Sequence, residues 1–534
     1  MRTAGGSPVL LHQMIDEAAH RRPEAAAVRC DGATLSYEEL ARQTNGMARV
    51  LLDAGLQRGD RVAVLLGKSL EVPVAFYGVL AAGGALVPID PKSPVEQVAR
   101  IINASGATHL ISQPEKGDVV GAALASCPDA RYAVGIETGP ETPVRSCSWE
   151  TVTEEATDRP PDVSVIDLDP SYILHTSGST GNPKLILHTH RSAMSFVEWA
   201  ADEYSLTGDD RLSNHSSHHT CFATFDFYGA ARAAASTVIL TPAAMLMPSS
   251  LAQLVERERI SVWYSVPTAL VQLLLRGNLE ERDLGALRWV LFAGESFPEK
   301  HLRRLMEQLP DARFSHVYGS TEVNVCTYFH LLPADEVPTP LPIGRACSSA
   351  ETLVVDETLE PVTDGGTGEL LISGSTVMSG YWDDPDRNRQ ALIQLPAPGG
   401  MEETFFRTGD RVRILEDGNL TFAGRADLQV KVRGYRIELE EVEHALLSLE
   451  NVHEAASFAV PDGEGSAAVH AAVVTDPDVP VTHKNLLDGL RKTLPLYAIP
   501  SEIAIVPSLP RTPTGKVDRK SLAATLAGNG DRDA

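Results

Sequence analysis

The first half of the chain alternates amphipathic helical segments with short apolar runs. A helical pattern over residues 37–54 precedes the apolar run 61–66, and a second helical pattern over 72–82 precedes the run 85–88. This alternation is typical of βαβ units, in which crossover helices cover a mainly parallel sheet. The sequence therefore predicts an α/β fold whose large N-terminal domain is built from parallel βαβ subdomains.

The pattern changes twice further along the chain. A polar, proline-rich stretch over residues 137–170 predicts a long connection, and turn signals multiply after residue 364 between alternating strands. Short strands with tight turns predict a small barrel-like or antiparallel subdomain. The last residues predict a compact α+β unit. We expect a domain boundary that separates a core of residues 1–426 from a small, mobile C-terminal domain of residues 427–534.

Composition limits the partners that the chain can bind. Acidic residues outnumber basic ones 71 to 46 among the 534 residues, for a net charge of -25, which disfavours nucleic acid. Six scattered cysteines form no disulfide or metal pattern and indicate a reducing, cytoplasmic setting. Prolines and glycines interrupt the long uncharged stretches, so no membrane span is expected.

One segment, Tyr172 to Lys184, carries most of the chemical information. An apolar strand runs into a loop rich in serine, threonine and glycine that a lysine closes. Such a loop can turn backbone N–H groups and hydroxyls toward phosphate oxygens. Its spacing is not that of the G-x-x-x-x-G-K-[ST] loop, and taken alone it also fits an ordinary surface loop.

Five more motifs follow this loop in a fixed order. They are Tyr318–Glu322, Phe406–Asp410, Gly424–Asp427, Gln429–Ile437 and Pro513–Lys516. Together with the loop they resemble the adenylate-forming (ANL) superfamily, and most closely the stand-alone adenylation enzymes of nonribosomal peptide synthesis such as prolyl loaders. The resemblance implies that ATP and a carboxylic acid form an acyl-AMP with release of pyrophosphate, after which a thiol captures the acyl group.

The resemblance also assigns roles to individual residues. The expected ATP-binding residues are Thr176, Ser177, Gly178, Ser179, Thr180, Gly181, Lys184, Gly294, Glu295, Tyr318, Gly319, Ser320, Thr321, Asp410 and Arg425. Glu322 is expected to hold Mg²⁺ and Lys516 to bridge the substrate carboxylate and the α-phosphate. Asp427 is the expected hinge for a second arrangement of the small domain, in which Lys431 enters the site.

The substrate depends on how the segment Thr220 to Gly229 aligns with amino-acid-activating relatives, which place an aspartate opposite the α-ammonium. The favoured register puts Cys221 at that position, and the alternative puts Asp226 there. A buried ammonium facing a neutral thiol lacks a partner, which disfavours ordinary α-amino acids. The expected pocket residues are Cys221, Phe222, Phe225, Tyr264, Leu291, Ala293, Val317, Val325 and Cys326. We expect a small, non-standard amino acid or a related carboxylic acid.

The acceptor is left open by the sequence. Only a short polar tail follows Leu522, so a carrier protein is expected to act in trans. Coenzyme A and an amine are the alternatives, and a nucleotide-binding protein without catalysis is the non-enzyme alternative. The segment Asn214 to His219 is rich in histidine, but it lacks a thiolate or carboxylate in register for a metal, and a role in packing or at the pocket mouth is favoured.

Overall fold

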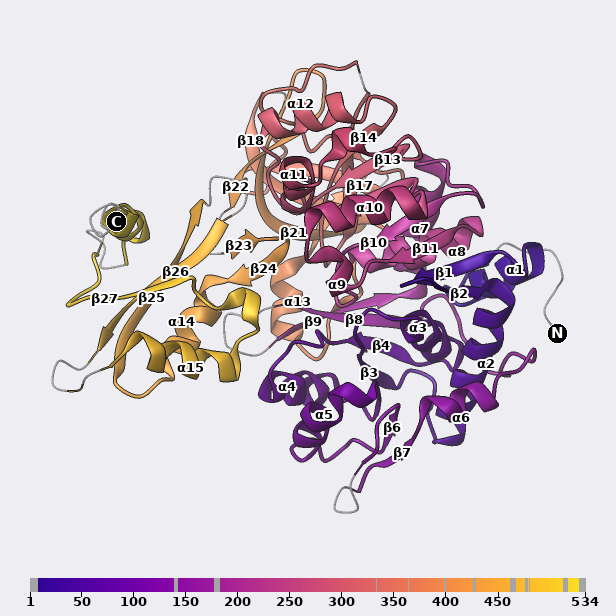
Figure 1. Ribbon diagram of the computed structural model, residues 1–534. Coiled ribbons are helices and arrows are strands. Elements are labelled where there is room, and N and C mark those ends of the chain that lie inside the picture. Colours follow the sequence, from indigo (N-terminus) through magenta and orange to yellow (C-terminus); the bar gives the residue numbers. More distant parts are fainter. Residues whose placement is uncertain are drawn as a thin grey trace.

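Two large sheets, an antiparallel sheet and a small C-terminal domain make up the chain (Figure 1). The computed structural model describes residues 8–138, 143–176, 183–332, 334–363, 365–397, 400–425, 429–461, 467–475, 479, 481–511 and 517–527.

The first large sheet has a parallel centre. Its eight strands run in the order β19 (Gly380–Tyr381), β9 (Lys184–Thr189), β8 (Pro170–Thr176), β4 (Ala85–Pro88), β3 (Arg61–Leu65), β5 (His109–Ser112), β6 (Tyr132–Val134) and β7 (Arg145–Cys147). All neighbours from β8 to β7 are parallel, whereas β9 pairs antiparallel with both β8 and β19. The β8–β9 pair brings Thr176 opposite Lys184. These two residues are the ends of the loop that the sequence predicts to bind phosphate oxygens, called the phosphate-type loop below.

The second large sheet follows the same plan. Its nine strands are β16 (Arg345–Ala346), β15 (Asn324–Leu331), β14 (Arg313–Ser320), β13 (Trp289–Phe292), β12 (Val262–Ser265), β10 (Arg211–Asn214), β11 (Ser236–Ile239), β1 (Ala26–Cys30) and β2 (Ala33–Ser36). The strands from β14 to β1 are parallel. Both sheets confirm the α/β prediction, because their centres are parallel and helix-covered.

Helices cover the sheets and contribute to their common core. They are α1 (Gln13–Arg21), α2 (Tyr37–Asp53), α3 (Glu71–Ala81), α4 (Val95–Ser105), α5 (Gly117–Leu124), α6 (Trp149–Glu154), α7 (His190–Glu203), α8 (Ala230–Ala233), α9 (Pro242–Met245), α10 (Pro248–Glu258), α11 (Pro267–Arg276), α12 (Glu299–Gln308) and α13 (Pro385–Ala391). Helix α2 begins at Ser36, whose side chain and that of Glu39 form a capping box. Helix α3 is buried along nearly its whole length within the core that both sheets share.

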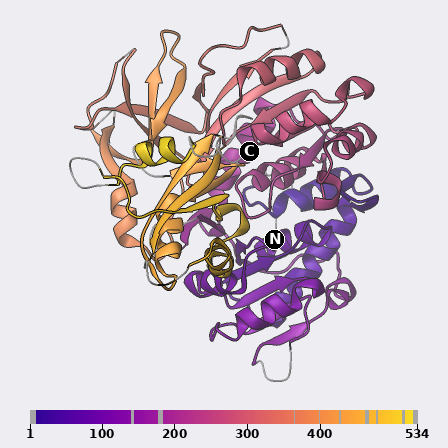
Figure 2. The same cartoon turned by 60° about the vertical axis from the view of Figure 1, so that its left-hand side comes forward.

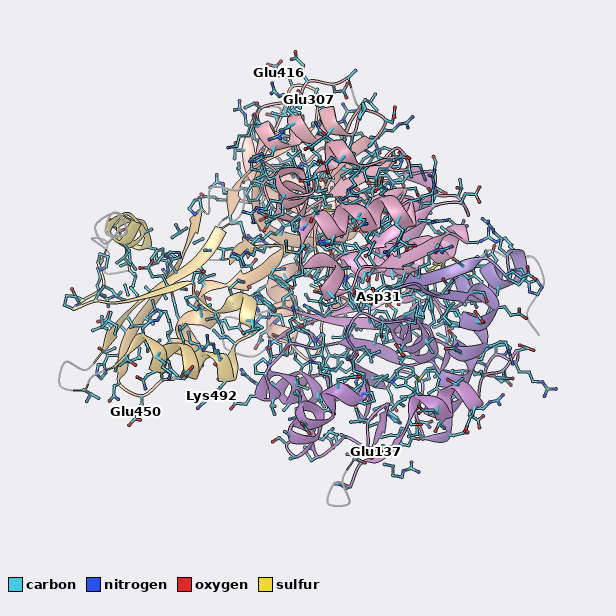
Figure 3. The ribbon with its side chains drawn as sticks, in the orientation of Figure 1. Asp31, Glu137, Glu307, Glu416, Glu450 and Lys492 are labelled. Atoms are coloured by element: carbon cyan, nitrogen blue, oxygen red, sulfur yellow. The ribbon has the colours of Figure 1, made fainter. Side chains whose placement is uncertain are left out.

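Charged side chains lie on the outside of this core. Glu307 on α12, Glu416 and Glu450 are exposed and point outward (Figure 3). These three carboxylates therefore lie on the solvated surface.

The third sheet is antiparallel, as the turn signals predict. It comprises β17 (Ala350–Val355), β18 (Thr367–Gly374), β21 (Met401–Ile414), β20 (Leu392–Ala397) and β22 (Leu420–Arg425). It begins earlier in the chain than residue 364. Its long strand β21 and neighbour β22 bring Asp410 opposite Arg425.

The small domain lies beside the third sheet and to one side of the two large sheets in both views (Figure 1, Figure 2). Its elements are β23 (Gln429–Val432), β24 (Tyr435–Glu438), α14 (Leu439–Leu447), β25 (Val452–Pro461), β26 (Ala467–Thr475), α15 (His483–Thr493), β27 (Glu502–Ile505) and α16 (Arg519–Ala527). Strands β23 and β24 form a hairpin whose turn residues, Arg433 and Gly434, both have positive φ. That conformation is typical of a two-residue turn and explains the tight reversal.

The stretch of residues 137–170, predicted to be a long connection, holds two short elements that the sequence did not reveal. This stretch contains β7, which adds an edge strand to the first sheet, and the helix α6. Trp149 at the start of α6 donates from its indole Nε1 to the Ser112 carbonyl at 2.8 Å. The strand is too short, and the flanking residues too polar, for a periodic pattern to reveal it.

Candidate active site

Two cavities meet where the large sheets, the third sheet and the hairpin of the small domain come together. The larger has a volume of about 640 Å³, and its walls include Val317, Tyr318, Asp410 and Arg425. The smaller has a volume of about 70 Å³. Gly294, Gly319 and Lys431 line both cavities. A molecule that spans the two would therefore pass the Lys431 side chain.

A tyrosine, a carboxylate and a guanidinium meet in the larger cavity. Tyr318 lies on β14, and its hydroxyl donates to the carboxylate of Asp410 on β21. The other oxygen of Asp410 accepts from Arg425 on the neighbouring strand β22. Burial raises the pKa of Tyr318 well above its ordinary value. An aromatic face beside a carboxylate suits a purine nucleoside, whose base stacks and whose ribose hydroxyls donate hydrogen bonds.

Gly294 and Glu295, expected beside the adenine, line the same cavity. The Glu295 carboxylate accepts from the Thr268 hydroxyl at 2.6 Å and from the Gly434 backbone N–H at 2.8 Å. Gly294 has φ +91°, in the left-handed region that favours glycine. The turn thus faces both the cavity and the small domain.

The structure describes Thr176, Pro183 and Lys184 at the two ends of the phosphate-type loop. Lys184 is buried, and its ammonium pairs with the Glu438 carboxylate of β24. Burial lowers the pKa of Lys184 despite this pairing. The expected residues Ser177, Gly178, Ser179, Thr180 and Gly181 lie outside the described residues.

Glu322, the expected metal ligand, follows β14 and is fully buried. Its carboxylate accepts from Arg436 at 2.7 and 2.8 Å and from the Tyr381 hydroxyl at 2.9 Å. Burial acts to raise the pKa of Glu322, but the Arg436 guanidinium outweighs it, and the pKa falls to about 2. Within the described residues, no group of three metal-ligating side chains is found. With Arg436 in place, this site does not fit a magnesium ion.

The hairpin of the small domain carries Lys431 into the centre of the site. Its ammonium lies 6.0 Å from the centroid of the Tyr318 ring. Burial lowers the pKa of Lys431, while the nearby Asp410 opposes this effect. This is the arrangement that the sequence resemblance associates with thiol transfer. Asp427 and Lys516, the expected hinge and catalytic lysine, lie outside the described residues, and α16, which follows Lys516, lies far from the large sheets (Figure 1).

The smaller cavity contains about half of the expected substrate-pocket residues. Those that line it are Cys221, Phe222, Tyr264, Ala293 and Val325, and Ser320 and Thr321 line it as well. Of the other expected residues, Val317 faces the larger cavity, whereas Leu291 and Cys326 are buried in the hydrophobic core. Phe225 packs edge-on against the Tyr264 ring at 5.7 Å, so it supports the pocket wall without lining it.

The two candidate positions for an ammonium partner face different surroundings. Cys221 lines the smaller cavity. Asp226 lies in a π-helical segment, Thr224–Gly229, is fully buried, and accepts from the Asn214 side-chain amide at 3.0 Å. Burial raises the pKa of Asp226 well above its ordinary value. This geometry supports the register that places Cys221 at the pocket.

Several lining residues were not expected from the sequence. Phe196 on α7, Asn324 at the start of β15, and Gly434 and Arg436 of the hairpin complete the smaller cavity. The two hairpin residues lie within the Gln429–Ile437 motif, so this motif could have indicated from the sequence that they belong to the site. Phe196 comes from a segment without a motif, and only the packing of α7 brings it to the site.

The histidine-rich segment packs within the fold. His218 Nε2 lies 2.9 Å from the Asn214 side-chain oxygen. The His219 ring stacks between those of His175 and Tyr435, at centroid distances of 5.9 and 6.2 Å. Because Tyr435 belongs to β24, this stack lies at the contact between the large and small domains.

The family is decided by comparison with known proteins. Residues 15–382 match the family described as AMP-binding enzyme, and residues 441–516 match the AMP-binding enzyme C-terminal domain. The chain belongs to the AMP-binding enzyme family. The predicted membership of the adenylate-forming superfamily is thereby confirmed.

Two relatives match this AMP-binding enzyme from end to end. An L-proline--[L-prolyl-carrier protein] ligase from Pseudomonas fluorescens is 33% identical over 521 residues, which cover 97% of the chain and 100% of the relative. A ligase of the same name from Streptomyces coelicolor is 34% identical and covers 97% of each chain. Surfactin synthase subunit 3 of Bacillus subtilis is 32% identical, but the match covers only 38% of that longer protein.

Solved structures share the fold. The amide bond synthetase McbA from Marinactinospora thermotolerans has a TM-score of 0.83 at 24% identity, covering 97% of this AMP-binding enzyme and 99% of that chain. The adenylation domain AlmE from Vibrio cholerae, solved with glycyl-adenosine-5'-phosphate, also has a TM-score of 0.83, at 22% identity and 99% coverage of both chains. These likenesses confirm an α/β adenylation fold with a C-terminal domain.

Among the helices in the described part of this AMP-binding enzyme, none combines the length and the apolar character needed to cross a membrane.

Proposed function

We propose that this AMP-binding enzyme uses ATP to convert a small carboxylic acid into an acyl-AMP and then transfers the acyl group to the phosphopantetheine thiol of a separate carrier protein. The two end-to-end relatives named as carrier-protein ligases support this acceptor. All six cysteines are free thiols, which supports a cytoplasmic setting.

The observation that carries the proposal is the junction of the two cavities at Lys431. An acyl-AMP is a nucleoside, a phosphate and an acyl group in linear order. The larger cavity suits the nucleoside, the smaller suits the acyl group, and Gly294, Gly319 and Lys431 lie between them. A fixed cation at this junction stabilises negative charge on the phosphate when the acyl group departs.

The nucleotide would be held by three side chains of the large domain. The Tyr318 ring offers a stacking face, Asp410 offers acceptors for ribose hydroxyls, and Arg425 offers a cation. Glu322 is the expected protein ligand of Mg²⁺, an ion that usually keeps several waters and binds through one or two carboxylates plus phosphates. Binding of that ion requires Arg436 to leave Glu322.

The substrate is proposed to be an acid without a free α-ammonium, or with its amino group displaced or modified. Among the described residues, no carboxylate lines the smaller cavity, and Lys431 and Arg436 supply positive charge there. An ammonium in these surroundings would lose its hydration and meet like charges. The proline named for the two relatives also carries an ammonium, which would meet the same positive charges in this cavity, so we propose a different substrate for this chain.

The test is carboxylate-dependent exchange between pyrophosphate and ATP over a panel of acids. The panel should pair each α-amino acid with its hydroxy, deamino and N-acylated analogue. We expect exchange with an acid that lacks the free ammonium. The activated acid is then offered to a phosphopantetheinylated carrier protein, to coenzyme A and to simple amines.

Thioester on the carrier in preference to the other acceptors is the expected result. Exchange with no acid on the panel, despite ATP binding, would contradict the proposed activity. Exchange followed by transfer only to coenzyme A or to an amine would contradict the proposed acceptor.

A further inference from the structure

One polar side chain in the wall of the smaller cavity is buried with part of its hydrogen-bonding capacity unused. Asn324 lines that cavity, and only 3% of its surface is exposed. Its Nδ2 donates to the hydroxyl of Tyr172 on β8 at 3.1 Å. Its Oδ1 has no hydrogen-bond partner among the described residues. A buried acceptor left unpaired costs free energy, which a ligand that donates a hydrogen bond to it would recover.

The amide of Asn324 is held in place by its backbone and by a neighbour. The backbone has φ +54°, in the left-handed region that asparagine tolerates better than most residues. Tyr172, which holds the amide nitrogen, is itself buried and lies outside the cavity wall. Because the oxygen and nitrogen of a carboxamide project in different directions, the oxygen is the end left for a ligand. Asn324 therefore offers the cavity a fixed acceptor.

Other side chains of this wall are less selective. Phe222 is apolar, and the hydroxyls of Ser320, Thr321 and Tyr264 can both donate and accept hydrogen bonds. An amide oxygen only accepts. Asn324 is therefore the residue that would distinguish a donor from an acceptor on the bound acid.

Asn324 lies close to the junction of the two cavities. It pairs with Ser320 across β14 and β15, next to the pair of Gly319 and Val325. Gly319 lines both cavities, and a Cβ at that position would collide with the Asn324 backbone carbonyl. Under the proposed function, this junction holds the carboxyl group of the acid. A group that reaches Asn324 would then sit on a carbon near that carboxyl.

We infer that the substrate carries a neutral hydrogen-bond donor, an O–H or an N–H, on the carbon α or β to its carboxyl group, and that Asn324 Oδ1 accepts from this donor. The simplest such substrate is a 2-hydroxy acid. Lys431 and Arg436 supply positive charge in the same cavity, so a neutral donor is favoured over an ammonium. The inference rests on the proposed function and narrows its substrate class.

Pyrophosphate exchange with matched acids tests the inference on the unmodified protein. Each set of acids shares one carbon skeleton and carries a hydroxyl, an N-acylated amine, a hydrogen or a keto oxygen at the α carbon. A second series moves the substituent to the β carbon. The keto oxygen is similar in size to the hydroxyl but cannot donate. We expect kcat/KM to be about tenfold or more higher for a donor-bearing acid than for the unsubstituted and keto acids of its set, because a site built to pair a donor rejects analogues that lack it.

Substitution of Asn324 tests the residue itself. Asn324→Gly removes the acceptor and keeps a residue suited to the left-handed backbone. We expect it to reduce the preference for the donor-bearing acid by about tenfold or more, while kcat/KM for the unsubstituted acid changes little. Asn278→Gly is the matched control, since Asn278 has φ +53° and is exposed outside the cavity wall.

Tyr172→Phe tests the support of the amide. It removes the hydroxyl that holds Nδ2 and leaves the oxygen of Asn324 in place. We expect a smaller reduction of the preference, by about threefold, because the acceptor remains but is less well fixed.

The outcomes separate this inference from the proposed function. Equal exchange with donor-bearing and unsubstituted acids, or better exchange with keto acids, would overturn the inference and leave acyl-AMP formation standing. An unchanged preference in Asn324→Gly, or an equal loss in Asn278→Gly, would also overturn it, since recognition would then not depend on the amide oxygen. Exchange with no acid at all, despite ATP binding, would instead contradict the proposed function and the inference with it.

Discussion

Cys221 is the residue on which substrate choice depends most directly. It lines the smaller cavity, whereas Asp226 is fully buried and accepts a hydrogen bond from Asn214. Cys221→Asp is expected to create a partner for an α-ammonium and to raise exchange with standard α-amino acids. A hydrogen bond to a charged group stabilises by about 1.5–3 kcal/mol, which corresponds to roughly 10- to 150-fold.

The measurement is pyrophosphate exchange with the same panel of acids. Asp226→Asn is the comparison and should leave substrate preference unchanged. The Cys221 assignment would fail if the wild type strongly activated a standard α-amino acid and only Asp226→Asn abolished that activity.

Lys516 and Lys431 are predicted to serve different half-reactions. Lys431 already lies at the junction of the cavities, whereas Lys516 lies outside the described residues. Lys516→Ala should lower acyl-AMP formation by about 10²- to 10³-fold, because a fixed cation at developing negative charge contributes roughly 3–4 kcal/mol. Transfer from preformed acyl-AMP should survive in this variant.

Lys431→Ala provides the reverse experiment. We expect this variant to retain most of its pyrophosphate exchange and to transfer the acyl group more slowly. Both rates are measured on each variant, with purified acyl-AMP for the second half-reaction. Equal loss of both half-reactions in Lys516→Ala would show that Lys516 and Lys431 do not serve separate half-reactions.

At the scale of elements, the β23–β24 hairpin is the structure that joins the two domains at the site. Gly434 has φ +83°, and a Cβ at this position would lie 2.4 Å from Cγ1 of Val266 in the large domain. Gly434→Ala should therefore oppose insertion of the hairpin. Overpacking of this kind costs about 1–3 kcal/mol, so thioester formation should fall by roughly 5- to 150-fold while pyrophosphate exchange is retained.

Gly418→Ala is the matched control for that substitution. Gly418 has φ +79° in a turn of the third sheet, and a Cβ there would meet nothing within 4 Å. It shares the backbone strain of the Gly434 variant but not the contact between domains. If both variants lost thioester formation equally, backbone strain and not hairpin insertion would be the cause.

At the scale of the whole molecule, buried histidines link stability to pH. The histidines whose pKa is lowered mainly by burial include His175, His188, His190, His215, His218, His219 and His316. The unfolded chain binds protons at these positions below about pH 6.5, whereas the folded chain does not. Stability is therefore present above that pH and is lost as the pH falls toward the lowered values.

His188 provides a quantitative check. Burial lowers its pKa to about 4, and its ring nitrogens lie 3.0 Å from the Ser192 hydroxyl and 2.8 Å from the Thr321 carbonyl. The free energy of unfolding should fall between pH 7.5 and 5.5, and His188→Gln should reduce that fall by about 1.4 kcal/mol. Urea unfolding followed by fluorescence measures this. The exposed His453→Gln should leave the fall unchanged, and an equal change in both variants would contradict the linkage.

Much of the fold could be predicted because it depends on local patterns. The strand Ala85–Pro88 has the predicted bounds, and α2 begins at its predicted first residue and ends one residue before its predicted end. Helical and alternating periodicities are properties of consecutive residues, so they are readable without the tertiary structure. The short edge strand β7 lacked such a pattern and was missed.

The sequence by itself determined the α/β architecture, the family and the order of the motifs, because these follow from residue types at fixed spacing along the chain. Only the tertiary structure decided which charges meet. It pairs Glu322 with Arg436 and Lys184 with Glu438, more than a hundred residues apart in each case. It also buries Asp226 while Cys221 faces the cavity. The physical reason is that burial and long-range pairing depend on how separate elements pack, and packing is not encoded in any one segment.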